Sequence, residues 1–256
     1  MNVRVITIPL ITEPWQRDLL RRRMELCRSL YNAEQNRLER RYHSMQRDKR
    51  YQRSKSSIDA VYAMKPAQRA QAKETEGYRR ALALQREVYG AYGFTAYTVH
   101  DRAILAARDH ASILPSRVAH YTIGIPLWQA MHGILMGEQT GFRYKRMGDI
   151  HSLSSDGRSG IRLLGPAGTN AREGIDLTEW SEKARRGEAP KDSGCRVIYG
   201  KGKGKRAICL PLKISPKDTY LIDTLRNPIR NIRILRRTQD RRDCYCVQLM
   251  VDSAWQ

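Results

Sequence analysis

NVRVITIPL (residues 2–10), followed by TEPWQRDLLRRRMELCRSLYNAEQNRLERRYHSM (residues 12–45), sets the architecture that the sequence predicts. The β-branched residues of the first stretch are typical of a strand. In the second stretch, apolar residues recur at helical spacing, which predicts a long helix capped by Thr12. The predicted apolar stripe is Trp15, Leu19, Leu26, Leu30, Leu38, Tyr42 and Met45, and the other faces carry Arg21, Arg22, Arg23, Arg28, Arg37, Arg40 and Arg41.

Sequence that favours helix continues to about residue 140. Residues 66–89 are rich in Ala, Gln, Arg and Glu, and residues 95–108 and 115–136 are also expected to be helical, with Pro126 starting or kinking a segment. From Gly141 on, short alternating stretches predict strands at residues 161–164, 195–199, 206–214, 229–236 and 243–251. Two short helices are expected there, one opened by Asp176 with Glu179 and ending near Gly187, the other at residues 216–225.

Charge is the strongest compositional signal. The chain has 47 Lys+Arg against 26 Asp+Glu, a net charge of +21, and this excess favours a polyanionic partner. Most of the basic residues are Arg, which binds phosphate through a planar fork. A supercharged soluble protein and a membrane-surface protein remain as alternatives. The five cysteines are odd in number and irregularly spaced, and no signal peptide is visible, so we expect a reduced, cytoplasmic protein whose Cys244 and Cys246 lie in the core.

Three basic segments are candidates for contact with phosphate. GKGKGKR (residues 200–206) alternates cations with glycines, which let the protein backbone approach a phosphate closely. A mobile hairpin tip with solvated charges is the alternative for this segment. GFRYKR (residues 141–146) places Tyr144 for base stacking among three cations. IRNIRILRR (residues 229–237) predicts an arginine ladder along a strand, with Ile232 and Ile234 turned to the core. A solvated sheet face is the alternative for this third segment.

Catalytic motifs were not found. The chain lacks Gly-x-Ser-x-Gly, His-Glu-x-x-His and Cys-x-x-Cys, and the acids Asp149, Asp156 and Asp252 have no sequence neighbours arranged for two-metal catalysis. The histidines form no i, i+4 metal pair. We therefore predict no catalytic residue, no metal and no cofactor in this chain.

The order of segments resembles the N-terminal part of TnpB, the transposon-encoded RNA-guided nuclease, and of the related type V CRISPR effectors. Three stretches carry the likeness: LCRSLYN (residues 26–32) with RLERRY (residues 37–42), GFRYKR (residues 141–146), and residues 229–237 with YCVQLMV (residues 245–251). The resemblance implies an α+β fold. Residues 1–11 and 141–256 would form a wedge-like, OB-like β-barrel, and residues 12–140 a helical recognition domain. It further implies guide RNA and target DNA as partners.

The RuvC nuclease domain of that family would begin after the point where this chain stops, so we expect no cleavage by this chain alone. A fragment, a split subunit that joins a RuvC-containing partner, and a protein reduced to binding all remain open. The other hypotheses are a stand-alone basic RNA-binding protein and an enzyme with its own nuclease or transposase centre. The residues expected to bind nucleic acid are Arg21, Arg22, Arg28, Tyr31, Asn32, Arg143, Tyr144, Lys145, Arg146, Lys201, Lys203, Lys205, Arg206, Arg230, Arg233, Arg236 and Arg237.

Overall fold

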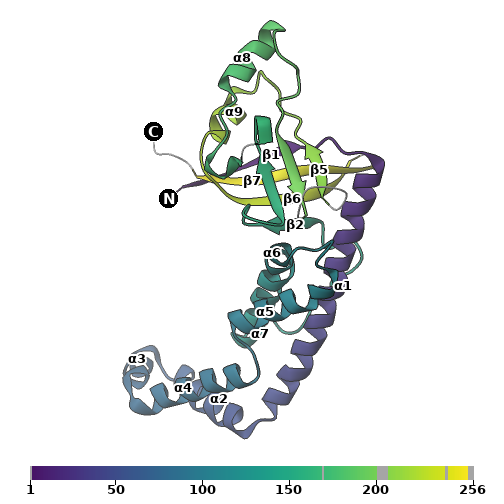
Figure 1. The fold of residues 1–256 in the computed structure, drawn as a ribbon. Helices are drawn as coiled ribbons and strands as arrows, with labels where there is room; N and C mark the ends of the chain where they lie inside the picture. The colour runs from purple at the N-terminus through teal and green to yellow at the C-terminus, as the bar shows by residue number, and fades with distance from the viewer. Residues whose placement is uncertain (1, 169, 201–206, 240–241, 253–256) are drawn as a thin grey trace.

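The computed structural model describes residues 2–168, 170–200, 207–239 and 242–252. The fold is mixed α+β, with two antiparallel sheets at one end and an arm of helices that extends away from them (Figure 1). Strand β1 (Val3–Pro9) leads into the long helix α1 (Pro14–Gln46), which forms the spine of the arm. Among the described helices, none has the length and the apolar composition needed to cross a bilayer.

The larger sheet has the strand order β1-β7-β6-β2, so the first and last strands of the described chain are neighbours. Its other members are β2 (Ser152–Ser155), β6 (Ile229–Gln239) and β7 (Arg242–Asp252). Register places Ile8, Val247, Ile234 and Leu153 in one row across the four strands, and all four are fully buried. This face of the sheet therefore covers the core, as the period-2 patterning of Ile232 and Ile234 predicts.

The smaller sheet has the order β3-β4-β5, from β3 (Ile161–Leu164), β4 (Arg196–Tyr199) and β5 (Ile208–Pro211). An antiparallel bridge between Leu10 and Leu212 joins it to the end of β1. Neither sheet of the described residues closes into the barrel that the family resemblance implies. Strand β2 pairs with β6 in the larger sheet, and β3 pairs with β4 in the smaller one. Among the described strands, β2 and β3 do not pair with each other.

Helix α1 spans 33 residues, which is about 50 Å at 1.5 Å per residue. Its N-cap is Glu13, whose backbone N–H donates to Gln16 Oε1 at 2.8 Å, so the predicted cap at Thr12 is wrong by one residue. The buried apolar stripe is shifted by one residue from the predicted one in the first part of the helix, where Trp15 is exposed, whereas Leu38 and Met45 are buried as predicted. It consists of Leu20, Met24, Cys27, Tyr31, Leu38 and Met45. The shift arises because the elements packed on a helix, and not its periodicity alone, decide which edge of a broad stripe is covered.

Three helices form the far end of the arm: α2 (Lys49–Tyr62), α3 (Pro66–Glu74) and α4 (Glu76–Ala91). The helix expected from residue 66 to 89 is broken at Thr75, which is extended and whose hydroxyl accepts from Tyr78 N. A small separate cluster of buried residues, Ile58, Val61, Tyr78 and Ala81, holds α2 against α4. We call residues 49–91 the distal hairpin.

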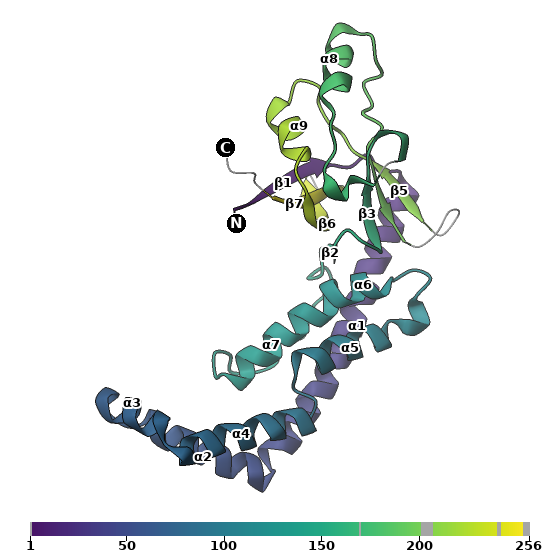
Figure 2. The same cartoon turned by 60° about the vertical axis from the view of Figure 1, so that its left-hand side comes forward.

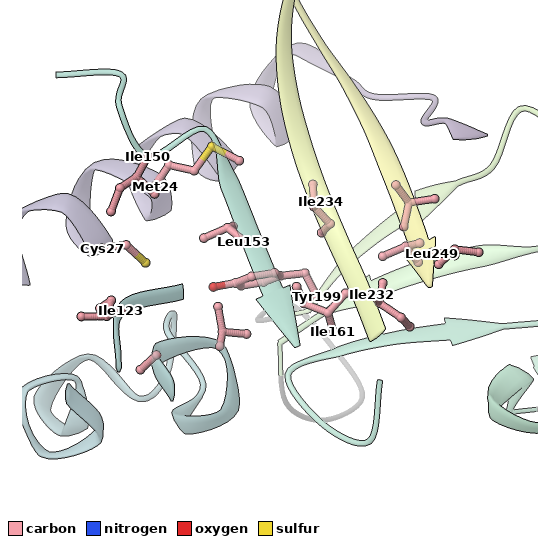
Figure 3. Packing of buried hydrophobic residues seen from close by; sticks show 14 of the residues in the cluster. Met24, Cys27, Ile123, Ile150, Leu153, Ile161, Tyr199, Ile232, Ile234 and Leu249 are labelled. Atoms are coloured by element: carbon pink, nitrogen blue, oxygen red, sulfur yellow. The ribbon is translucent and has the colours of Figure 1, made fainter. Parts of the chain in front are cut away.

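Helices α5 (Ala96–Ala106), α6 (Ser116–Ala119) and α7 (Ile125–Leu135) cross the middle of α1 (Figure 2). A 3-10 turn, η1 (Arg108–His110), follows α5, and a π-helical turn, η2 (His120–Gly124), joins α6 to α7, which has Pro126 in its first turn. Their apolar residues share one core with α1 and the sheets. Figure 3 shows part of this cluster, from Ile123 and Cys27 through Leu153 and Tyr199 to Leu249. The sheets and the middle helices are therefore packed as a unit.

The remaining elements cover the outer end of the sheets. They are the 3-10 turns η3 (Pro166–Gly168) and η4 (Ala171–Glu173) and the helices α8 (Thr178–Arg186) and α9 (Thr219–Leu225). Both helices end close to the predicted positions. Asp176 accepts from Thr178 N at 2.9 Å at the start of α8, and Gly187 takes the left-handed conformation at its end.

Candidate nucleic-acid interface

Residues 141–150, which we call the connector, lie along α1 on the way from the helices to β2. Asn32 holds the Lys145 backbone by two hydrogen bonds: its Nδ2 donates to the carbonyl at 2.9 Å and its Oδ1 accepts from the N–H at 2.8 Å. Beyond Asn32 on α1, Tyr144 Oη donates to Glu39 at 2.6 Å, and before Asn32, Gly148 N donates to Glu25 at 3.1 Å. The connector therefore runs antiparallel to α1 over about four helical turns.

These contacts give two of the predicted binding residues a packing role. Tyr31 is 2% exposed, and burial raises its pKa to about 12, so its ring has no free face for a base. The Lys145 ammonium lies 5.5 Å from the centre of that ring. Asn32 uses its side-chain amide on the connector backbone. Both residues position the connector, and the reason lies in the tertiary fold, which brings residue 145 back to residue 32.

The connector presents basic side chains to solvent. Arg143 and Arg146 are exposed, and neither forms an ion pair within the described part of the chain. Between them, Tyr144 is 45% exposed, and its hydrogen bond to Glu39 raises its pKa to about 12. An aromatic ring flanked by two guanidinium groups matches the stacking and phosphate contacts of single-stranded nucleic acid.

The predicted arginines of α1 lie in ion pairs on its surface. Arg21 and Arg22 share Asp18, each at 2.8 Å, and Arg28 contacts Glu25 at 2.6 Å. The hydrogen bond from Arg21 is the main cause of the lowered pKa of Asp18. Exposed pairs of this kind contribute little to stability, so a phosphate can compete with the carboxylate for the same guanidinium.

The arginines of β6 do not form the single ladder that the sequence predicts. Arg233 and Arg237 share the exposed face, and Arg233 donates to Ser154 on β2 at 3.1 Å. Arg236 lies on the opposite face and donates to the Gly148 carbonyl at 3.3 Å. Arg230 is the extra residue of a bulge, where the register shifts, and pairs with Asp252. The bulge and the strict alternation of a strand together divide the four side chains among three directions.

Arg236 nevertheless joins a second group of basic residues. Its guanidinium lies near Glu25 of α1, next to the connector, and near Tyr245 on β7. Arg17, which the sequence analysis missed, lines a cleft of about 470 Å³ with Asp18, Arg21 and Asp243. The spacing of 17, 21 and 28 is a helical signal that could have found it. We call Arg17, Arg21, Arg28, Arg143, Arg146 and Arg236 the spine arginines.

The other predicted segment, with Lys201, Lys203, Lys205 and Arg206, lies outside the described residues. Cys244 and Cys246 lie on the same face of β7, opposite the face that covers the core, as strand alternation predicts. Cys246 is buried there, but Cys244 is exposed, so the prediction of burial is wrong for Cys244.

Charge is distributed unevenly along the fold. Residues 14–91, from α1 through the distal hairpin, carry 19 basic and 9 acidic residues. Residues 92–140, the middle helices, have three of each: Arg102, Arg108 and Arg117 against Asp101, Asp109 and Glu138. The excess charge therefore belongs to the spine, to the distal hairpin and to the β-rich half, where the arginines above are found.

No protein-family model matches this chain, and no curated protein matches it. The candidate function consequently depends on geometry and charge. Among the described His, Cys, Asp and Glu side chains, no group of three or more is placed to hold a metal ion.

Proposed function

We propose that this chain is a nucleic-acid-binding module of an RNA-guided DNA-targeting effector, which holds guide RNA and the guide–target heteroduplex and does not cleave them itself. One observation carries the proposal: the connector is fixed along α1 so that Arg143 and Arg146 are exposed without carboxylate partners among the described residues, beside the exposed Tyr144. A guanidinium without an internal partner is available to phosphate.

The length of the spine supports a helical ligand. The spine arginines lie along α1 from Arg17 to the level of Glu39, which Tyr144 contacts. At 1.5 Å per residue this stretch is about 33 Å, close to one turn of duplex, which is about 34 Å. Reading by backbone and shape suits a protein that leaves sequence recognition to base pairing. Under this proposal the two joined sheets act as the wedge-like part, and the middle helices and the distal hairpin act as the recognition lobe.

The three acids noted in the sequence have local partners. Asp149 accepts from Arg146 N at 2.7 Å, and Asp156 lies 3.9 Å from both Arg117 and Arg158. Asp252 pairs with Arg230. Asp156 and Asp252 line one pocket, and Asp149 lies outside its lining. Two-metal catalysis needs carboxylates around a shared metal centre, and among the described His, Cys, Asp and Glu residues no group of three or more is placed for one.

Binding of RNA by the double variant Arg143→Gln/Arg146→Gln tests the proposal. We expect its affinity for a structured guide-like RNA to fall about tenfold, because two charge-assisted contacts are lost. The matched control is Lys213→Gln/Lys217→Gln, which removes the same charge from exposed positions in the β-rich half. Equal losses in both variants would show that the connector has no special part in binding.

A second comparison separates the guided role from general RNA binding. The guided role predicts tighter binding of a structured scaffold RNA than of random RNA of equal length, and no metal-dependent cleavage of either. Equal affinity would favour a stand-alone RNA-binding protein, and cleavage by the purified chain would overturn the proposed role.

A further inference from the structure

A pocket of about 680 Å³ lies where the ends of β6 and β7 meet the turn η2, away from the spine arginines. Its charged lining residues are Arg117, Arg158, Arg172 and Arg230 with Asp156, Glu173 and Asp252, and Tyr121 lines it as well. The volume falls within the range of small-ligand sites, about 300–1,000 Å³. The pocket is thus large enough for one nucleotide.

Two glycines bring distant segments together around the pocket. Gly160, at φ +83°, lies so close to α6 that a Cβ would be 2.9 Å from Val118. Gly174, at φ +109°, leaves room for the Arg226 carbonyl, which a Cβ would approach to 2.2 Å. The first contact places the turn with Asp156 and Arg158 beside Arg117, and the second places Arg172 beside the start of β6.

Two of the four guanidinium groups of the pocket share a distant partner, whereas Arg230 pairs closely with Asp252. Asp156 lies 3.9 Å from both Arg117 and Arg158, beyond the 2.7–3.2 Å of a good hydrogen bond. Arg172 is exposed and makes no side-chain ion pair with another described residue. By comparison, Arg28 and Glu25 approach to 2.6 Å. Arg117, Arg158 and Arg172 can therefore gain contacts from an anionic ligand.

The pocket lining contains both arginines and carboxylates, and this mixture favours some anionic ligands over others. Three carboxylates offset three of the four guanidinium groups, so the pocket is a poor site for a bare polyanion. Carboxylates instead accept hydrogen bonds from ribose hydroxyls and base amines. Tyr121 belongs to a π-helical turn, a rare geometry that is frequent at functional sites, and its ring offers a face for stacking.

We propose that this pocket binds a nucleotide that bears a terminal phosphate, either at the end of a strand or as a free mononucleotide. The phosphate contacts Arg158 and Arg172, and the base lies by Tyr121. The proposal rests on nucleic-acid binding as the function of the chain, but it concerns a separate surface and can fail separately.

The test measures fluorescence anisotropy of internally labelled 12-nucleotide RNAs that carry a 5′-phosphate, a 3′-phosphate or only hydroxyl ends. We expect at least one phosphorylated RNA to bind the full chain about tenfold more tightly than the hydroxyl-ended RNA. Arg158→Gln/Arg172→Gln should abolish this preference. The matched control, Arg53→Gln/Arg86→Gln, removes the same charge from exposed positions of the distal hairpin, and its preference should persist.

Equal binding of all three RNAs by the wild-type chain, or a preference that survives in Arg158→Gln/Arg172→Gln, would overturn the pocket. Matching melting curves for the two double variants show that both are folded. Competition by AMP identifies a free mononucleotide as a sufficient ligand, and lack of competition identifies the strand end; both results support the pocket. If none of the RNAs binds the wild-type chain, the proposed function fails, and calorimetry with AMP alone then decides the pocket.

Discussion

At the scale of single residues, Gly174 is the described glycine at which an added Cβ would come closest to another atom. Its φ of +109° disfavours any L-residue, and a Cβ there would lie 2.2 Å from the Arg226 carbonyl. Gly174→Ala should therefore lower the free energy of unfolding by at least about 2 kcal/mol. For a chain of this size, that corresponds to a fall in Tm of roughly 4–8 °C in a thermal melt.

Gly187→Ala is the control for this prediction, because Gly187 also has a positive φ, +79°, but its Cβ would meet no atom within 4 Å. Equal effects of the two substitutions would mean that backbone strain, and not the approach of residue 226, explains the requirement for glycine.

A pair of histidines makes stability depend on pH. The rings of His100 and His120 are 4.6 Å apart, and burial lowers the pKa of both. In the unfolded chain both pKa values return to about 6.5, so the unfolded state binds more protons below that pH. Stability is then fully present above about pH 6.5 and is lost as the pH falls through the lowered pKa values of the folded state.

Thermal melts at pH 7.5 and pH 5.5 check this prediction. The groups that face the pair also include Arg117, which lowers the pKa of His120, and Asp156, which raises it. We expect the fall in Tm to shrink in His100→Gln, because one of the two lowered pKa values is removed. An unchanged fall would assign the pH dependence to other groups.

Residue types alone could identify where arginines are dense, but not what each one contacts. Arg23 was expected on an outer face of α1, yet it is 5% exposed, its guanidinium lies 4.4 Å from the centre of the Tyr199 ring, and burial lowers its pKa. Tyr31 and Asn32 were assigned to a ligand and instead hold the connector. Such roles depend on partners more than 100 residues away, which spacing in the sequence does not encode.

At the scale of elements, the connector depends on one side chain. Asn32→Ala removes both hydrogen bonds to Lys145, at about 1 kcal/mol each, so the free energy of unfolding should fall by about 2 kcal/mol. RNA affinity should fall as well, although residue 32 carries no charge, because Arg143 and Arg146 lose their fixed position. Denaturant melts and anisotropy check the two effects.

Asn36→Ala serves as the control for this prediction, since Asn36 lies one turn further along α1 and its side chain accepts from Arg40 at 3.3 Å. RNA affinity that is unchanged in Asn32→Ala would separate the connector from binding.

The distal hairpin is the element most easily removed. Its own apolar cluster lies beyond Tyr51 and Val88, which belong to the main core. Replacing residues 55–84 with a four-residue Gly-Ser turn should leave the melting transition of the remainder intact and remove helical signal from circular dichroism. RNA affinity should fall, because the replaced segment has six basic and three acidic residues. Loss of the cooperative transition would show that the arm is needed for folding.

The sequence predicted helices and strands better than it predicted side-chain contacts or sheet closure. The strand–helix start, five of the six described strands of the β-rich half and the helix near Gly187 follow from periodicity and capping, which are local. The break at Thr75, the π-helical turn and the bulge at Arg230 do not, because each is a local irregularity fixed by packing. The short strand β2 was not predicted. Together with strand alternation, the bulge explains why the arginines of β6 are divided and do not form the predicted ladder.

At the scale of the whole molecule, binding should depend steeply on salt. Each phosphate neutralised on duplex contributes about −0.9 to the slope of log K against log salt. Arg233→Ala/Arg237→Ala should flatten the slope by up to about 1.8 if both contact phosphate from the exposed face of β6. A titration at several salt concentrations measures this. An unchanged slope would place the outer face of the sheet outside the interface.

Sheet closure was the main architectural expectation that the described strands do not meet. The sequence predicts six of the seven described strands, with β2 missed. Closure depends on the tilt and stagger of every pair, which no local pattern specifies. Here the turn from residue 156 to 160 packs on α6 and separates β2 from β3.

The pairing of β1 with β7 has a consequence for how the chain is made. During synthesis the opening strand cannot pair along its length until β7, about 240 residues later, has left the ribosome; before that only its end can bond, to residues 211–213. The middle helices can form meanwhile from nearby segments, whereas the larger sheet must assemble last. A nascent chain halted at residue 240 should therefore have protected helices and an opening strand that proteases can still cut.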